Sequence, residues 1–95
     1  MKNLKKAVEH FELAAEMGNR MAHNFVGQCY MTGQGVNEDH AKAIRHFENG
    51  FQANSHEAIN NLGVCYDKGR GVAKDPRQAY VYYKYAAKLG NKIAK

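Results

Sequence analysis

Two cysteines and five histidines are the side chains of this sequence best suited to bind a metal ion or to form a nucleophile–base pair. A local zinc site needs ligands at short spacings such as Cys-x-x-Cys or His-x-x-x-His, and neither pattern occurs. Instead, Cys29 and Cys65 lie 36 residues apart, and so do His10 and His46. Equal spacing over such a distance indicates copies of one structural template. We therefore expect no catalytic residue, no metal site and no cofactor.

A tyrosine-rich segment at residues 79–85 (AYVYYKY) could stack on the bases of a single-stranded nucleic acid. The charge distribution is compatible with this, because residues 68–95 carry eight Lys and Arg against one Asp, whereas residues 1–67 carry six against eight acidic residues. We interpret most of this basic end as solvated surface and Tyr83 as a core residue, which leaves Tyr80 and Tyr85 as exposed candidates. Binding of nucleic acid or acidic lipid at the basic C-terminal surface is the least favoured of three functional hypotheses.

An internal repeat of 36 residues must position all these side chains. Residues 20–55 align with residues 56–91 without a gap and share 10 identities. A fixed period of this length is typical of a solenoid, in which each unit buries its apolar face against its neighbours. Adjacent solenoid helices pack ~8–10 Å apart, which is too far for a disulfide between equivalent cysteines. We therefore interpret Cys29 and Cys65 as small buried thiols.

Helical spacing of apolar residues predicts helices at about 3–17, 20–32, 40–53, 56–68 and 76–89. Gly18-Asn19 and Gly90-Asn91 are expected to end the first and last of these helices. The fold is predicted to be all-α, an α/α superhelix of helix-loop-helix repeats with about five helices and a C-terminal stub. We expect one array over residues 1–95, composed of the second helix of a partial unit (1–19), two full units (20–55 and 56–91) and the start of a next unit (92–95).

Several repeated positions are predicted to be structural. Glycines in the helices should let a neighbouring helix approach closely, and glycines in the loops should allow a tight reversal. The repeated tyrosines should fill space between units, each with a hydroxyl that needs a partner. These structural positions are Gly27, Tyr30, Gly33, Gly35, Gly63, Tyr66, Gly69 and Gly71. Asp39 and Asp75 are expected to cap the helices that follow them, and Phe11, Phe47 and Tyr83 to form a continuous core row.

These positions carry a family resemblance that covers nearly the whole chain. The sequence resembles the Sel-one-like repeat, a relative of the tetratricopeptide repeat with a longer loop between its helices. The resemblance lies in the run Ala58-x-x-Asn61-Leu62-Gly63-x-x-Tyr66-x-x-Gly69-x-Gly71-Val72-x-x-Asp75 and in Ala79-x-x-Tyr82-Tyr83-x-x-Ala86-Ala87-x-x-Gly90-Asn91. It implies a scaffold or adaptor for other proteins, as in membrane-protein degradation complexes, bacterial signalling or host–pathogen contact. The sequence departs from the family at His10, His46 and Tyr82, which stand where a tryptophan is usual.

Resemblance to tetratricopeptide grooves implies that the first helix of each unit lines the inner face of the superhelix and binds a peptide or helix of a partner. The corresponding stripe of side chains is Met21, Asn24, Gln28 and Met31 in one unit and Glu57, Asn60, Val64 and Asp67 in the next. The two repeated asparagines are the leading candidates, because an amide can both donate to and accept from a peptide backbone. An interaction scaffold is therefore the preferred hypothesis.

The second hypothesis is a structural module that assembles end to end, as a dimer or array, through exposed terminal helices. Apolar side chains such as Leu4, Val8 and Phe11 suggest an uncovered end. We find no membrane span and no secretory signal in the sequence. Together with unpaired cysteines, this favours a cytoplasmic location, while a longer parent protein that is secreted or lies in a lumen remains compatible.

Overall fold

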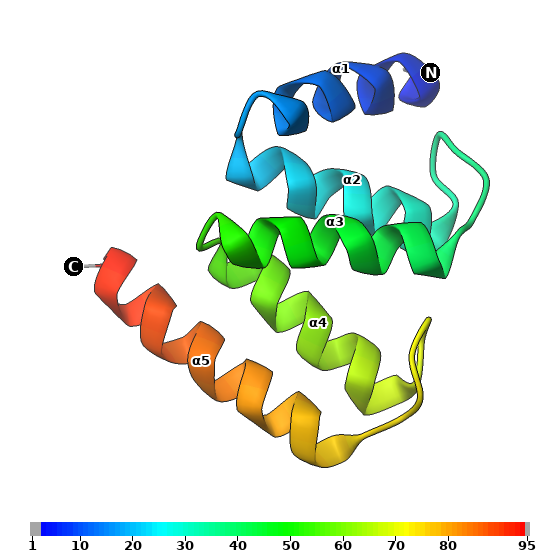
Figure 1. Ribbon diagram of the computed structural model, residues 1–95. Helices are drawn as coiled ribbons and strands as arrows, with labels where there is room; N and C mark the ends of the chain where they lie inside the picture. Colours follow the sequence, from blue (N-terminus) through cyan, green and yellow to red (C-terminus); the bar gives the residue numbers. More distant parts are fainter. Residues whose placement is uncertain (1–2, 95) are drawn as a thin grey trace.

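The computed structural model describes residues 3–94, and side chains up to Gly90. These residues form helices joined by short loops, with no strand among them (Figure 1). The helices are α1 (Leu4–Glu16), α2 (Arg20–Thr32), α3 (His40–Gln52), α4 (His56–Lys68) and α5 (Pro76–Ala94). The all-α prediction is therefore confirmed, and the first four helices begin and end within one residue of the predicted bounds. Within the described range, no helix combines the length and apolar character needed to cross a membrane.

Each helix start is capped by a short polar side chain, and the two caps predicted from the sequence, Asp39 and Asp75, are confirmed. The side-chain oxygens of Asp39 and Asp75 accept hydrogen bonds from the backbone N–H three residues later, at 3.1 and 3.2 Å. Asn3, Asn19 and Ser55 do the same at the starts of α1, α2 and α4. These bonds satisfy backbone donors that a helix leaves free at its first turn.

The two inter-helix loops repeat the same backbone conformation. Gly33 and Gly69 end α2 and α4 with positive φ angles of 75° and 71°, in the left-handed region that favours glycine. Each loop then returns to its own helix, where the N–H of Asp39 donates to the Tyr30 carbonyl and the N–H of Asp75 to the Tyr66 carbonyl, both at 2.8 Å. The loop glycines therefore serve the reversal that the sequence predicts.

The predicted end of the last helix is wrong. Gly90-Asn91 does not close α5, which continues to Ala94, so residues 92–94 extend this helix and form no separate stub. The equivalent Gly18 has a φ of 95° and leads into α2, which packs on α1. Continuing α5 through these residues adds a backbone hydrogen bond per residue. Lys95 lies outside the described residues.

The helices form a superhelical arrangement with two distinct sides. Consecutive helices pack on each other, and α2 also contacts α4. The helices α3 and α5 meet through side chains at one point, where the Phe51 ring lies edge-on to the Tyr85 ring with 5.4 Å between centroids, and their ribbons otherwise spread apart (Figure 1). The first helices of the two units therefore lie together on one side, and the second helices spread along the other. This is the curvature expected of a helix-pair solenoid.

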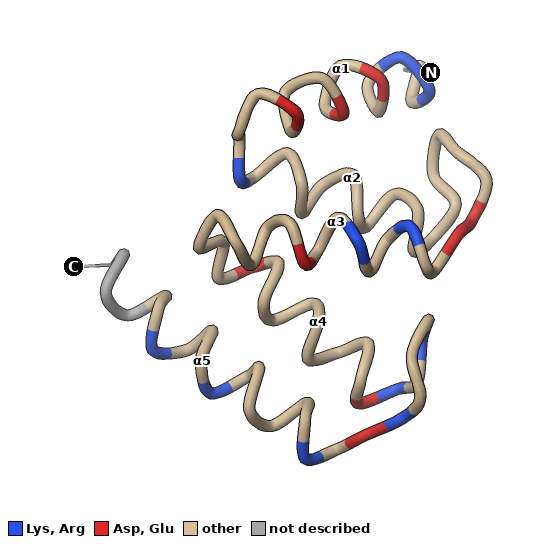
Figure 2. The backbone as a smooth tube through the Cα atoms, in the orientation of Figure 1, with Lys and Arg blue, Asp and Glu red and all other residues tan. Residues whose placement is uncertain are grey.

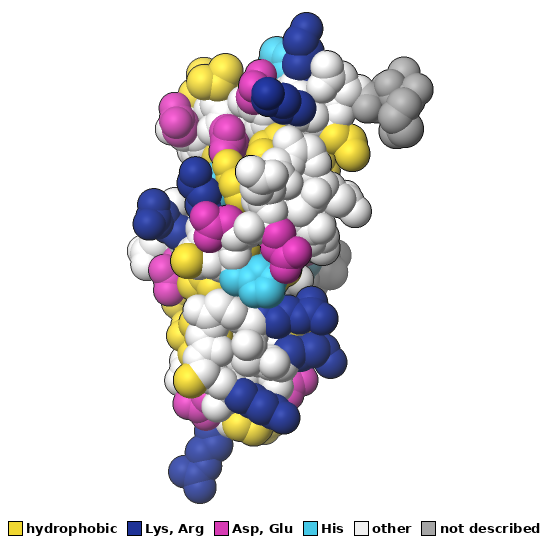
Figure 3. Space-filling model, turned by 90° about the vertical axis from the view of Figure 1, so that its right-hand side faces the viewer, with side chains coloured by type: hydrophobic (Ala, Val, Ile, Leu, Met, Phe, Trp, Pro, Cys, Tyr) yellow, Lys and Arg dark blue, Asp and Glu magenta, His cyan; other side chains and the backbone are white. Residues whose placement is uncertain are grey.

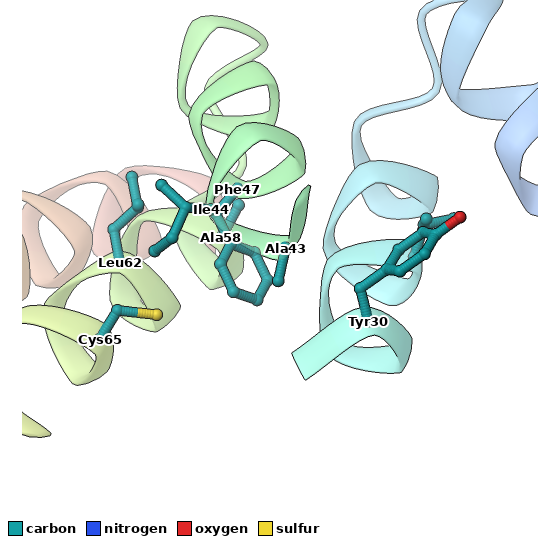
Figure 4. Close-up of a cluster of buried hydrophobic side chains, with 8 residues drawn as sticks. Tyr30, Ala43, Ile44, Phe47, Ala58, Leu62 and Cys65 are labelled. Atoms are coloured by element: carbon teal, nitrogen blue, oxygen red, sulfur yellow. The ribbon is translucent and has the colours of Figure 1, made fainter. Parts of the chain in front are cut away.

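The core lies between α2, α3 and α4. Buried side chains from all three helices meet there, with Phe47, Ala58 and Leu62 each at most 1 % exposed (Figure 4). A Cβ atom on Gly27 would lie 2.5 Å from the Phe47 ring, and one on Gly63 would lie 2.8 Å from the Tyr83 ring. Since real Cβ contacts are longer, the structure confirms that these glycines permit close helix approach.

The predicted continuous core row of aromatic residues is wrong at its first member. Phe47 is buried and Tyr83 is half-buried, but Phe11 is 41 % exposed. Among the described helices α1 contacts α2 alone, so Phe11 has a neighbour on one side, the Phe25 ring at 4.4 Å between centroids. A repeated position is buried only where helices pack on both of its sides.

Candidate functional site

The predicted inner stripe lies on the surface of α2 and α4. Met21, Gln28, Glu57 and Asn60 are exposed, whereas the other members are half-buried. Those half-buried members are Asn24, Met31, Val64 and Asp67. The stripe therefore offers both polar groups and apolar surface, which a contact with another protein needs.

A pocket of about 260 Å³ opens between α2 and α4. It is lined by side chains of both helices, of the two loops and of α3, namely Phe25, Gln28, Cys29, Met31, Thr32, Gln34, Phe47, Asn61, Val64, Cys65 and Arg70. Throughout, we refer to this cavity as the α2–α4 pocket. It is a concave and largely apolar feature of the face on which α2 and α4 meet.

Three of the eight predicted stripe residues line the α2–α4 pocket: Gln28, Met31 and Val64. Asn24 lies beside it, because its side-chain oxygen accepts a hydrogen bond from the Asn61 amide. The other four do not line the pocket. Of these, Asp67 lies next to Tyr83 of α5, where burial and the nearby carboxylate raise the pKa of the tyrosine.

Most lining residues come in equivalent pairs, one from each unit. Adding 36 to the residue number takes Phe25 to Asn61, Gln28 to Val64, Cys29 to Cys65 and Gln34 to Arg70. Only the cysteines are identical. The predicted stripe does not include Phe25 and Asn61, because it is displaced by about one position around each helix. It does not include Gln34 and Arg70, because these two residues lie in the loops after α2 and α4. One signal in the sequence could have identified them. They are positions close to the repeated cysteines, Cys29 and Cys65, at which the two aligned units carry different residues.

The electrostatics of the pocket are simple. Burial raises the pKa of the Cys29 thiol, and it raises that of Cys65 to about 11 despite the nearby Arg70 cation. Both thiols are therefore neutral near pH 7, and both are free cysteines. Arg70 is the one charged side chain in the lining. The pocket thus combines apolar walls, side-chain amides and a single cation.

The repeated tyrosines, Tyr30 and Tyr66, pack against side chains of neighbouring helices. The Tyr30 hydroxyl donates to the Glu12 carboxylate at 2.8 Å, and its ring stacks on His46 with centroids 6.0 Å apart. The Tyr66 ring stacks on Tyr82 at 5.5 Å. Burial raises the pKa of both tyrosines, that of Tyr30 to about 12, with Glu12 adding to the effect. Both hydroxyls therefore stay protonated at neutral pH.

The basic end of the sequence forms a separate surface. Within the described residues, α5 carries lysine and arginine but no acidic residue, whereas α1 carries three glutamates (Figure 2). Seen from the side of the loops, basic side chains predominate over the half formed by α4 and α5 (Figure 3). Tyr80 and Tyr85 are 62 % and 41 % exposed, as predicted, and they line a shallow groove with Lys84 and Lys88. In the part of the chain that the structure describes, no three His, Cys, Asp or Glu side chains gather as metal ligands would.

The Sel1 repeat family matches the chain at residues 1–19, 20–54 and 56–91. A comparison with curated proteins gives no match. A comparison with solved structures gives clear matches. A Sel1 repeat protein from Oxalobacter formigenes superposes with a TM-score of 0.85 at 26 % identity, over 99 % of this chain and 39 % of that protein.

Two further structures are equally similar. The protective antigen c5321 of uropathogenic Escherichia coli, which displays an SLR fold, gives a TM-score of 0.86 at 30 % identity over 92 % of this chain and 19 % of its own length. Cysteine-rich protein B of Helicobacter pylori gives 0.85 at 27 % identity over 94 % of this chain and 67 % of its own. The chain thus spans about two fifths of the first of these three proteins and one fifth of the second.

Proposed function

The chain belongs to the Sel1 repeat family, whose repeats generally serve as protein–protein interaction modules. From this premise, we propose that it binds a peptide or helix segment of a partner protein along the face formed by α2 and α4. The observation that carries the proposal is the α2–α4 pocket, which lies between the two helices that come together on one side of the superhelix. Concave apolar surface framed by polar groups is typical of such recognition sites.

Side-chain amides beside the pocket suit the recognition of a polypeptide backbone. Asn24 and Asn61 already pair with each other, and each amide keeps further donor or acceptor capacity. Exposed Gln28 and Asn60 extend the same polar frame along the surface. A bound segment would satisfy its own N–H and C=O groups against these amides while it covers the apolar wall.

The same proposal assigns the chain no catalysis of its own. A cysteine nucleophile acts as a thiolate, and burial raises the pKa of both thiols, which holds them neutral. The tyrosines at the repeated positions are likewise held protonated. These groups support packing between units.

Site-specific photocrosslinking tests the proposal. A photoreactive amino acid at Gln28, which is exposed on α2 and lines the pocket, should capture a discrete partner from an extract of the source cells. The matched control places the same group at Glu48, which is exposed on α3 on the other side of the superhelix. Capture from Gln28 alone supports the proposal, and equal capture from both positions contradicts it.

Self-association is a second candidate, favoured by exposed large apolar side chains on the first and last helices. These are Leu4, Phe11 and Leu13 on α1, Met17 directly after it, and Tyr80, Val81 and Tyr85 on α5. The expectation that Val8 is uncovered is wrong, because Val8 is buried, at 1 % exposed. Light scattering over a wide range of protein concentrations tests this candidate. A mass that stays at one chain up to millimolar concentration would dismiss it.

A further inference from the structure

We infer that the α2–α4 pocket selects an acidic peptide segment, taking up one side chain of leucine or methionine size while Arg70 pairs with a carboxylate close to it in the segment. This inference rests on the proposed function and names the chemistry of the partner.

The size of the pocket limits its occupant. Its volume of about 260 Å³ lies below the range of roughly 300–1,000 Å³ that is usual for cofactors and drug-sized ligands. One aliphatic side chain with part of its backbone fits this space, whereas a nucleotide or a haem does not. The pocket is therefore sized for an anchor residue of a polypeptide.

The walls of the pocket are suited to an apolar anchor. Phe25 and Met31 come from α2 and Val64 from α4, and all three are half-buried. The thiols of Cys29 and Cys65, 5 % and 2 % exposed, close its inner side as neutral groups. Methionine is flexible and polarisable, so it can adjust to an aliphatic side chain. A charged anchor would lose its hydration without gaining a partner at these walls.

The polar groups lie at the two ends of the pocket. The helices α2 and α4 run in the same direction (Figure 1). Asn61 lies in the body of α4, and Arg70 lies in the loop beyond the end of this helix. Seven helical residues separate Asn61 from the end of α4, which corresponds to about 10 Å at 1.5 Å per residue. About three extended residues span this distance. An acidic group near Arg70 therefore lies within about three residues of an anchor side chain that is seated between the two ends, against Met31 and Val64.

Arg70 favours an acidic segment over a basic one. It is the one charged residue of the lining, it is exposed, and it makes no ion pair within the described residues. Lys68 and Lys74 lie on either side of it in the sequence, and with Asp67 and Asp75 the segment 67–75 has three basic and two acidic residues, a net charge of +1, whereas the equivalent segment 31–39 has two acidic residues and no basic one, a net charge of −2. The equivalent loop of the preceding unit has the neutral Gln34. The charge thus distinguishes this end of the pocket from the rest of the repeated surface.

Peptide selection with a random nine-residue phage library tests the inference on the whole chain. Enriched peptides should share a Leu or Met with an Asp or Glu within about three positions. Affinities of a synthetic consensus peptide are then measured by fluorescence anisotropy at low and high salt. Changing its apolar residue to Ser should weaken binding more than 10-fold, and changing its acidic residue to the amide should weaken it about 2–5-fold, as expected for an exposed ion pair.

Three protein variants locate the effect. Gln28→Trp fills the pocket from an exposed position and should reduce affinity more than 10-fold, with circular dichroism to confirm the fold. Arg70→Gln, which copies the neutral residue of the other loop, should reduce it about 2–5-fold and remove most of its salt dependence. Arg77→Gln removes an equal charge on α5, outside the pocket, and should leave the affinity unchanged.

The outcomes separate this inference from the function on which it rests. Peptides that are blocked by Gln28→Trp but show no preference for an acidic residue would overturn the inference and leave the proposed function standing. Binding that survives Gln28→Trp would overturn both, and a library that enriches no peptide would overturn the inference. If the free protein dimerises in sedimentation experiments and Gln28→Trp does not, the occupant is a second copy and the inference is wrong.

Discussion

The two full units have the same backbone conformation but differ in the side chains that they bury between their helices. In both units the first helix has 13 residues, ends at a left-handed glycine and stacks its tyrosine on the second helix. In residues 20–55 that tyrosine stacks on His46, which faces His23 with 3.4 Å between the two Nδ1 atoms. In residues 56–91 the corresponding positions are Tyr82 and the fully buried Ile59. The repeat therefore fixes the geometry, and the non-identical residues decide whether the interior is polar or apolar.

The histidine pair gives the first unit a titratable interior that the second unit lacks. One Nδ1 must donate and the other accept, so the contact needs at least one neutral ring. Burial lowers the pKa of both histidines, and the charge of His23 lowers that of His46 further, against the opposing effect of Glu12 on α1. Lys42 and Arg45 on α3 act in the same direction as burial. Four sets of variants test the differences between the two units.

The largest effect is expected from filling the helix contacts at the repeated glycines. Gly27→Val should destabilise the protein by about 2–3 kcal/mol and Gly63→Val by about 1–2 kcal/mol through overpacking. The difference arises because the Phe47 ring opposite Gly27 is fully buried, whereas the Tyr83 ring opposite Gly63 is half-buried and can shift. Urea unfolding measures both. An unchanged midpoint for either variant would refute close approach at that position.

A smaller effect is expected where the first unit carries a glycine that the second replaces by alanine. Gly50→Ala copies Ala86, and its Cβ would lie 2.5 Å from the Cβ of Ala58. Alanine favours a helix over glycine by about 1 kcal/mol, but overpacking costs about 1–3 kcal/mol. We expect a net loss of about 1 kcal/mol in thermal or urea unfolding. A stabilised variant would show that α3 and α4 can separate at this point.

The tyrosine hydroxyls should differ between units. Tyr30→Phe removes the hydrogen bond to Glu12 and should cost about 1 kcal/mol. Tyr66→Phe removes a hydroxyl for which we find no hydrogen-bond partner in the described part of the chain, so it should cost little. Paired unfolding curves measure the difference. Equal losses in both variants would indicate that the two tyrosines make equivalent contacts.

The smallest effect is a pH dependence confined to the first unit. A histidine whose pKa is lowered by folding binds fewer protons in the folded than in the unfolded state, so the free energy of unfolding falls as pH drops through the ordinary value of 6.5. His23→Ile with His46→Tyr copies the second unit and should flatten this dependence between pH 7.5 and 5. The other three histidines remain as an internal control. Parallel curves for both proteins would contradict the assignment.

The candidate site was only partly predictable from the sequence. The stripe that includes Gln28, Met31 and Val64 reaches the α2–α4 pocket, but Phe25, Asn61 and Arg70 were not anticipated. Helical periodicity tells which residues share a face, yet the rotation of that face toward a neighbour depends on the angle at which α2 and α4 pack. A rotation by one position replaces most members of a stripe. The loop residue Arg70 joins the pocket through tertiary contact alone.

The repeat, the helix starts and the glycine-dependent turns and close contacts follow from the amino-acid sequence alone. These features follow from local rules: the period of apolar residues, capping by Asp39 and Asp75, and the positive φ angles of Gly33 and Gly69. Three features depend on how the helices pack: Phe11 is exposed, α5 continues through Gly90, and four equivalent pairs meet at one pocket. The physical reason is that burial and helix ends depend on which neighbours are present on each side, and a repeated residue does not carry that information.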